Sequence, residues 1–369
     1  MTTRERIMAI LRYQKYDQFP LIHFGYWTET LEKWRDEGHI TKELFAQCQG
    51  DNSTGEREVS KTLGFDFCWQ PHISVNSGLF PCFEPRIIEE REDGTYLEFD
   101  YNGVVVQKKH GDVSIPAEVS HTLVDRESWE KEYVHRLQFS PKRVPDLSYL
   151  KDQHPDEPRG LHCGSFYGMI RDIAGIVGLS YIYADDEDLY AEIIDTVANL
   201  SYDCTKAVLE QGVTFDYAHF WEDICFKNGP LLSPKTFREK CGPHYARIVD
   251  LYRQYGTELF SVDCDGDIDL LIPTWMEAGV KIMFPIEVGT WNGNILDIRK
   301  KHGRDVRGVG GMDKRVFTAD RTEIDREIER LKPMVADGGF IPCVDHLITP
   351  DADWDLVCYY CEQMNKTFN

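Results

Sequence analysis

Residues 258–288 read ELFSVDCDGDIDLLIPTWMEAGVKIMFPIEV, and this stretch decides the fold. An apolar run at 258–262 predicts a strand, an amphipathic pattern at 268–278 predicts a helix, and an apolar run at 281–285 predicts a second strand. Two strands joined through a helix lie parallel in one sheet. The acidic loop DCDGD at 263–267 follows the first strand. The unit therefore predicts an α/β fold with polar residues at a strand end.

The same alternation continues on both sides of this stretch. Further strands are expected at 159–163, 214–218, 306–308 and 339–342. Further helices are expected at 187–209, 234–255, 295–301 and 322–334. Six strand–helix units together with an N-terminal pair predict a closed (β/α)₈ TIM barrel rather than an open sheet.

The first half of the chain is less regular. Helical patterns cover 4–13, 28–36 and 126–134. Between 81 and 108, short β-type runs are separated by Asp93-Gly94 and Asn102-Gly103, which are hairpin signals. We expect one barrel domain over residues 1–369 with a small antiparallel β accessory near residues 80–110, as part of a hairpin excursion that covers 80–118.

Composition and charge narrow the class of protein. The formal net charge is −22, which disfavours nucleic acid and other polyanionic partners. The sequence contains no run of eighteen apolar residues, and its first residues resemble an amphipathic helix rather than a signal peptide, so no membrane association is expected. The eleven cysteines are scattered and odd in number, which favours a reduced, cytoplasmic setting.

Polar side chains follow several of the predicted strands. They are His219, Trp221, Glu222, Asp223, Asp263, Asp265, Glu287, Asp345 and His346. In α/β barrels the loops after the strands form the active site. Carboxylates that gather there repel one another unless a cation or a proton lies among them. The pattern therefore predicts either a metal site or an acid–base cluster.

Structural interpretations exist for the same residues. Asp267 fits the N-cap of the helix at 268–278, and Glu222 with Asp223 fits a solvated loop. His346 also fits a structural histidine. The cysteines at strand ends fit either soft metal ligands or small buried thiols. They are Cys163, Cys264 and Cys343.

Five segments carry a family resemblance that covers nearly the whole chain. They are TTRERIMAILRYQKYDQFP (2–20), LLSPKTFREKCGPHYARIVDLYRQYG (231–256), VDCDGDIDLLIPTWMEAGV (262–280), GVGGMDKRVF (308–317) and GGFIPCVDHLITPD (338–351). Together they resemble the uroporphyrinogen decarboxylase-like superfamily, which includes cobamide-dependent methyltransferases. The true decarboxylases carry an N-terminal arginine that holds a polycarboxylated substrate. The matching segment here, IHFGYW at 22–27, has no arginine, which favours the methyltransferase branch.

The resemblance also implies a metal site with altered ligands. Methyltransferases of this type carry a zinc-binding His-x-Cys-Gly motif and a later cysteine four residues before a proline. Aligned on Gly266 and Pro350, those positions are Asp263, Asp265 and His346 in this chain. Zinc accepts carboxylate and imidazole ligands, and harder ligands leave it a stronger Lewis acid. The implied role is polarisation of a methyl ether oxygen while a cobamide on a partner protein attacks the methyl carbon.

Roles for the remaining residues follow from their positions. We expect Glu222, Asp265 and Glu287 to be catalytic, and Tyr26, Trp27, His219 and Trp221 to bind substrate. The expected partners are a corrinoid protein and a small-molecule methyl donor or acceptor, and the superfamily also implies a homodimer. The first alternative is a decarboxylase acting on a tetrapyrrole or a smaller substrate. A glycoside hydrolase that uses paired carboxylates and a non-catalytic tetrapyrrole carrier are further alternatives.

Overall fold

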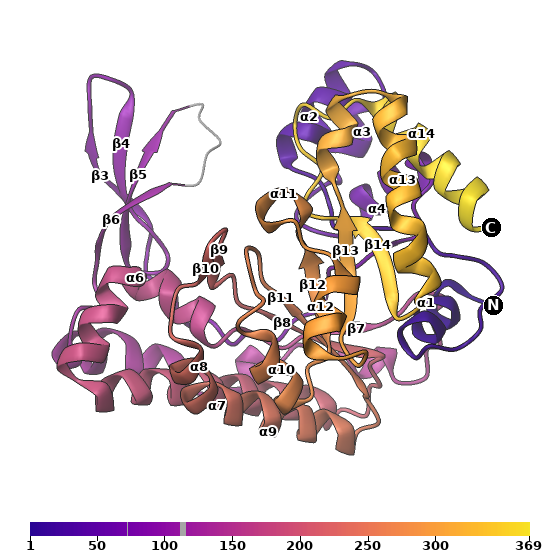
Figure 1. Cartoon of the computed structure of the whole chain (residues 1–369). Helices are drawn as coiled ribbons and strands as arrows, with labels where there is room; N and C mark the ends of the chain where they lie inside the picture. Colours follow the sequence, from indigo (N-terminus) through magenta and orange to yellow (C-terminus); the bar gives the residue numbers. More distant parts are fainter. Residues whose placement is uncertain (72, 111–115) are drawn as a thin grey trace.

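The computed structural model describes residues 1–71, 73–110 and 116–369 (Figure 1). It is an α/β fold built on a parallel sheet, as the sequence predicts. In the described part of the chain, no helix combines the length and apolar character that crossing a bilayer would need.

Six parallel strands form the main sheet, and their spatial order follows their order in the chain. They are β7 (Gly160–His162), β8 (Tyr217–Trp221), β11 (Leu259–Asp263), β12 (Ile282–Ile286), β13 (Arg307–Met312) and β14 (Phe340–Val344). Every residue of β11, β12 and β14 is buried, which explains their continuous apolar sequences. Each predicted strand is present, with bounds displaced by one to four residues.

A second parallel pair lies between the two edges of this sheet. It consists of β1 (Ile22–His23) and β2 (Phe67–Cys68). Isolated parallel bridges, Tyr26 to Ile348 and Ser74 to His162, connect the neighbouring chain segments to the main sheet. Within the described residues the ladders form separate sheets, so the expected closed ring of eight strands is not observed. Single bridges, rather than ladders, join this pair to the main sheet in the described structure.

Helices follow the strands of the main sheet. They are α6 (Tyr167–Asp185), α7 (Glu187–Leu209), α8 (Pro234–Lys240), α9 (Gly242–Gln254), α10 (Ile272–Ala278), α11 (Val288–Trp291), α12 (Ile295–His302), α13 (Arg321–Ala336) and α14 (Trp354–Phe368). The single helix predicted over 234–255 is wrong. It breaks at Cys241, because Pro243 lacks an amide donor and begins a new helix.

The N-terminal region supplies α1 (Thr3–Leu11), α2 (Thr28–Asp36), α3 (Lys42–Phe45) and α4 (Thr54–Leu63). The loop before α4, which contains Asp51, lies near the carboxyl ends of the main-sheet strands. The helix predicted over 126–134 is present as α5 (Arg126–Ser128) followed by a π-helical turn, Trp129–Tyr133.

A four-stranded antiparallel sheet projects from the body beside α6 (Figure 1). It contains β3 (Arg86–Glu90), β4 (Thr95–Phe99), β5 (Val104–Lys109) and β6 (Ala117–His121). Gly94 and Gly103 adopt φ of 80° and 82° at the two predicted turns, a conformation that glycine permits. The predicted accessory is therefore confirmed and contains a fourth strand. Positions 111–115 of the predicted excursion lie outside the described residues.

Candidate active site

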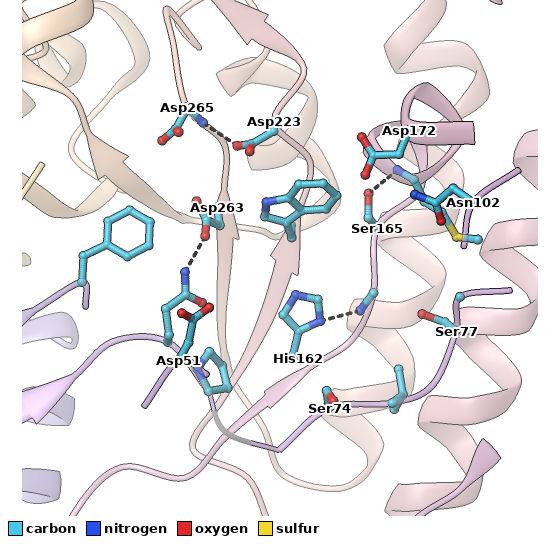
Figure 2. A pocket seen from close by; sticks show the side chains of 18 of the residues that line it. Asp51, Ser74, Ser77, Asn102, His162, Ser165, Asp172, Asp223, Asp263 and Asp265 are labelled. Atoms are coloured by element: carbon cyan, nitrogen blue, oxygen red, sulfur yellow. Dashed lines mark hydrogen bonds between the residues drawn. The ribbon is translucent and has the colours of Figure 1, made fainter. Parts of the chain in front are cut away.

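A cavity of about 630 Å³ opens at the carboxyl ends of β8 and β11 (Figure 2). Its polar lining includes two histidines and five carboxylates. They are His162, His346, Asp51, Asp172, Asp223, Asp263 and Asp265. Among the described residues that line the cavity, none is a lysine or an arginine. The cavity therefore suits a cation or a metal ion better than an anion.

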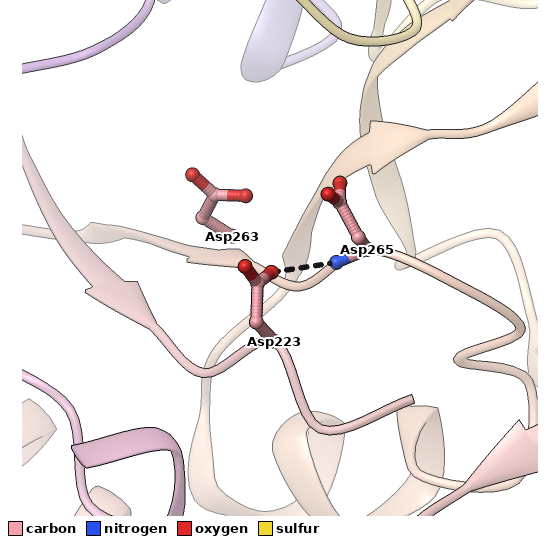
Figure 3. A group of neighbouring side chains, drawn as sticks. All are labelled: Asp223, Asp263 and Asp265. Atoms are coloured by element: carbon pink, nitrogen blue, oxygen red, sulfur yellow. Dashed lines mark hydrogen bonds between the residues drawn. The ribbon is translucent and has the colours of Figure 1, made fainter. Parts of the chain in front are cut away.

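Three aspartates meet on one wall of this cavity (Figure 3). Asp263 is the last residue of β11, Asp265 lies two residues further, and Asp223 follows β8. Each offers a carboxylate oxygen within 4.8 Å of the others. The amide of Asp265 donates a hydrogen bond of 3.0 Å to Asp223 Oδ1, which ties the two loops together. We call Asp223, Asp263 and Asp265 the β8–β11 cluster.

The β8–β11 cluster carries an electrostatic cost. Burial raises the pKa of Asp263 well above its usual value, and the charges of Asp223 and Asp265 raise it further. A hydrogen bond of 2.8 Å from Gln70 Nε2 opposes this rise. Burial and the charge of Asp265 raise the pKa of Asp223 to about 6. The described chain gives these three carboxylates no lysine or arginine ion pair within 4.0 Å. A bound cation would remove this repulsion.

His346 lies beside the cluster, in contact with one of its members. Its Nε2 is 3.2 Å from Asp265 Oδ2, and its ring packs against Phe24 and Trp27. Two buried atoms here have no hydrogen-bond partner in the described structure: Asp265 Oδ1 and His346 Nδ1. The expected ligands Asp263, Asp265 and His346 thus line one cavity. However, the compact three-residue group contains Asp223 in place of His346.

The donor set fits a divalent metal ion. Carboxylate oxygens and an imidazole nitrogen are ligands that zinc accepts, and the two unpartnered atoms are groups that a ligand would satisfy. Cysteine ligation does not fit this cavity, because no cysteine occurs among its described lining residues. Cys163 Sγ donates to the His219 carbonyl at 3.1 Å, and Cys264 Sγ accepts from the Ile224 amide at 3.4 Å.

The two glutamates expected to be catalytic lie behind the cavity wall. Glu222 is fully buried and accepts hydrogen bonds from the amides of Phe166 and Gly168 at 3.0 and 2.7 Å, and from the Tyr245 hydroxyl. Glu287 accepts from the Gly266 amide at 2.6 Å. Both therefore hold loops that position the aspartates.

The four residues expected to bind substrate occupy different places. Trp221 lines the cavity, and Trp27 lies next to His346. Tyr26 is buried, with its hydroxyl 2.9 Å from Ser60 Oγ. His219 is fully buried below the cluster, with Nε2 3.8 Å from Asp263 Oδ2. Burial lowers the pKa of His219 well below its usual value, and the nearby His162 lowers it further.

Several cavity residues were not predicted from the sequence. Asp51 and Gln70 come from the N-terminal loops, Asn102 from the β4–β5 turn, and Asp172 from α6 (Figure 2). Only the tertiary structure brings these segments to the strand ends. Asp172 was within reach of sequence reasoning, because it follows the loop after the strand at 159–163.

Comparison with known proteins gives a family and a fold. A family model described as uroporphyrinogen decarboxylase (URO-D) matches residues 169–366, more than half of the chain. A solved structure of a methyltransferase from Methanosarcina mazei is 12% identical, with a TM-score of 0.62 over 100% of this chain and 99% of that chain. Another, described as a candidate vitamin-B12-independent methionine synthase from Listeria monocytogenes, is 12% identical, with a TM-score of 0.42 over 96% of this chain and 100% of that one. No curated protein matches.

Proposed function

We propose that this chain, which belongs to the uroporphyrinogen decarboxylase (URO-D) family, is a metal-assisted methyltransferase. The methyl group passes between a small molecule and a cobamide carried by a partner protein. We also interpret the main sheet and the β1–β2 pair as an interrupted (β/α)₈ barrel. The Methanosarcina methyltransferase of the same fold supports the choice of reaction class at a coarse level.

One observation carries the proposal: the β8–β11 cluster has three neighbouring carboxylates whose only basic neighbours within 4.0 Å, among the described residues, are the histidines His219 and His346. A substrate with many carboxylates would be repelled by this wall, because no lysine or arginine is among the described lining residues to hold it. A divalent cation would be attracted for the same reason. Decarboxylation of a polycarboxylated tetrapyrrole therefore fits the cavity poorly.

Different side chains of the cavity have different roles in the proposed reaction. Asp223, Asp263 and Asp265, with His346 beside them, would hold one divalent ion, which we take to be zinc. When bound, the ion supplies Lewis acidity toward an ether oxygen. Glu222 and Glu287 fix the loops that carry the ligands. Trp221 and Phe24 offer apolar faces to the organic part of the substrate.

Methyl transfer to free cob(I)alamin tests the proposal. Zinc-supplemented protein is mixed with cob(I)alamin and, in separate reactions, with 2-methoxyphenol, 2-methoxybenzoate or (2-methoxyethyl)trimethylammonium. Formation of methylcobalamin is followed by absorbance. We expect transfer from at least one donor, and a loss of about 100-fold or more in Asp263→Asn, which removes a charged ligand.

Asp267→Asn is the matched control. It changes the same charge in the same loop, while its amide oxygen still accepts the 3.1 Å hydrogen bond from the Asp269 amide. This variant is expected to keep wild-type activity. Turnover of uroporphyrinogen at ordinary enzyme rates, with no methyl transfer from any of the donors, would reject the proposal in favour of a decarboxylase.

A further inference from the structure

We infer that the methyl donor of this site carries a positively charged ammonium group, and that Asp51 is the carboxylate that receives it. The inference rests on the proposed function, because it assigns Asp223, Asp263 and Asp265 to the metal ion. It adds the charge class of the substrate and a specificity residue outside the β8–β11 cluster.

The charges of the cavity support a cationic ligand. Of the five carboxylates in the lining, Asp172 is neutralised by Arg171, whose Nη2 lies 2.7 Å from it. The remaining four carry about four negative charges when ionised, and a divalent ion would compensate only two of them. No lysine or arginine pairs with Asp51 in the described part of the chain, and no basic group shifts its pKa. A monocation would therefore be favoured even in the metal-loaded protein.

Polar atoms in and below the cavity indicate that a ligand belongs here. His219 is 0% exposed, both of its ring nitrogens lack a hydrogen-bond partner in the described structure, and Nε2 lies 3.8 Å from Asp263 Oδ2. Asp265 Oδ1 and His346 Nδ1 are likewise unpartnered. Buried polar atoms seldom remain unsatisfied in native proteins. These atoms constitute an observation separate from the acidic charge.

Asp51 is placed to select the ligand. It lies on the loop before α4, is exposed to solvent, and lines the same cavity as Asp263 (Figure 2). Its negative charge contributes to the raised pKa of Asp263, so the two carboxylates are within electrostatic range. Trp221 also lines the cavity, and its ring is of the kind that attracts cations, as its contact with the Arg171 guanidinium 5.6 Å from the ring centroid illustrates.

Matched ligands of different charge test the inference by isothermal titration calorimetry, without any corrinoid. The cation is (2-methoxyethyl)trimethylammonium, its neutral isostere is 1-methoxy-3,3-dimethylbutane, and the anion is 3-methoxypropanoate. On zinc-loaded protein we expect the cation to bind at least about tenfold more tightly than the neutral ether, with an affinity that falls as salt increases. Equal or tighter binding of the neutral ether or the anion, or no binding of the cation, would overturn the inference.

A charge-removing variant locates the ammonium site. Asp51→Asn should weaken binding of the cation about tenfold, while binding of the neutral ether and the zinc content stay at wild-type values. Asp203→Asn, which removes an exposed carboxylate on α7 outside the cavity, is the control and should change nothing. Wild-type affinity in Asp51→Asn would reject the role of Asp51. Retained cation binding without methyl transfer to cob(I)alamin would instead contradict the proposed function alone.

Discussion

Two groups of carboxylates lie at the carboxyl ends of the strands of the same parallel sheet. They differ in whether arginine side chains pair with them. The β8–β11 cluster contains three acids without an arginine or lysine ion pair in the described chain. The second group, which we call the β13–β14 cluster, consists of Asp313, Glu327 and Asp345. Arg315 lies 2.6 Å from Asp313, and Arg330 Nε donates to Glu327 at 2.7 Å.

Backbone amides complete the β13–β14 cluster. Asp345 Oδ2 accepts from the amides of Val288 and Gly289 at 2.9 and 3.0 Å, and Oδ1 accepts from the Lys314 amide at 3.2 Å. Burial alone would raise the pKa of Asp313, but hydrogen bonds from Arg315 leave it below the usual value. The β13–β14 cluster therefore stabilises the fold, whereas the carboxylates of the β8–β11 cluster have no arginine or lysine partner in the described chain, which is the basis for the metal site that we propose.

The largest expected effect is on activity. Asp223→Asn retains the oxygen that accepts a hydrogen bond from the Asp265 amide but removes a carboxylate that we propose as a metal ligand. Methyl transfer to cob(I)alamin should fall about 100-fold, while the free energy of unfolding in urea changes by no more than about 2 kcal/mol. Wild-type activity in this variant would show that the two clusters do not differ in function.

The next effect is on stability and concerns the other cluster. Asp345→Ala leaves three amide donors without their acceptor, and each unsatisfied buried donor costs roughly 1–3 kcal/mol. Urea denaturation should show a loss of about 2–4 kcal/mol once water reaches part of the site. A variant as stable as the wild type would contradict the structural role of this cluster.

The β8–β11 cluster should also make the stability of the protein depend on pH. In chelator-treated protein the folded-state pKa of Asp223 is about 6, above its ordinary value of 3.8. The folded state then binds more protons than the unfolded state, so stability is full below pH 3.8 and falls as pH rises through about 6. We expect this term to be roughly 1–2 kcal/mol after solvent screening, and to vanish in Asp223→Asn. Denaturation curves in urea at pH 4, 5, 6 and 7 measure it, and equal pH dependence in both proteins would refute it.

The smallest effect is expected at the exposed edge of the β13–β14 cluster. Arg315 is 64% exposed in its ion pair with Asp313, so solvent screens most of the attraction. Arg315→Ala should lower the unfolding free energy by less than about 1 kcal/mol and leave methyl transfer unchanged. A larger loss would mean that the arginine, and not the backbone amides, organises this cluster.

The sequence predicted the parallel strands and most helices because their apolar periodicity is strong. It placed β8 three residues too early: the strand begins at Tyr217, after Asp216, whose carboxylate accepts from Arg4 Nε and the Arg159 amide. As a result, His219 and Trp221 lie within the strand rather than after it. Helix α6 was missed because glycines interrupt its pattern, and the helix is kinked at Gly175 (φ 66°).

The candidate site was predictable only in part. Asp263, Asp265 and His346 follow strands, and strand ends meet at one edge of a parallel sheet, so their shared location could be derived. Asp223 was visible as a neighbour of Glu222. However, the sequence could not tell which of the two faces the cavity, because that depends on the loop conformation after β8. Asp51 comes from a different region of the chain and gave no local signal.

Metal binding by the β8–β11 cluster tests the central claim most directly. Zinc is titrated into chelator-treated wild-type protein in competition with a chromophoric chelator, alongside Asp263→Asn and Asp313→Asn. The account predicts one tightly bound ion per chain in the wild type and in Asp313→Asn, and an affinity lowered about 100-fold or more in Asp263→Asn. A wild-type protein that binds no stoichiometric ion, or an Asp263→Asn variant with undiminished affinity, would contradict it.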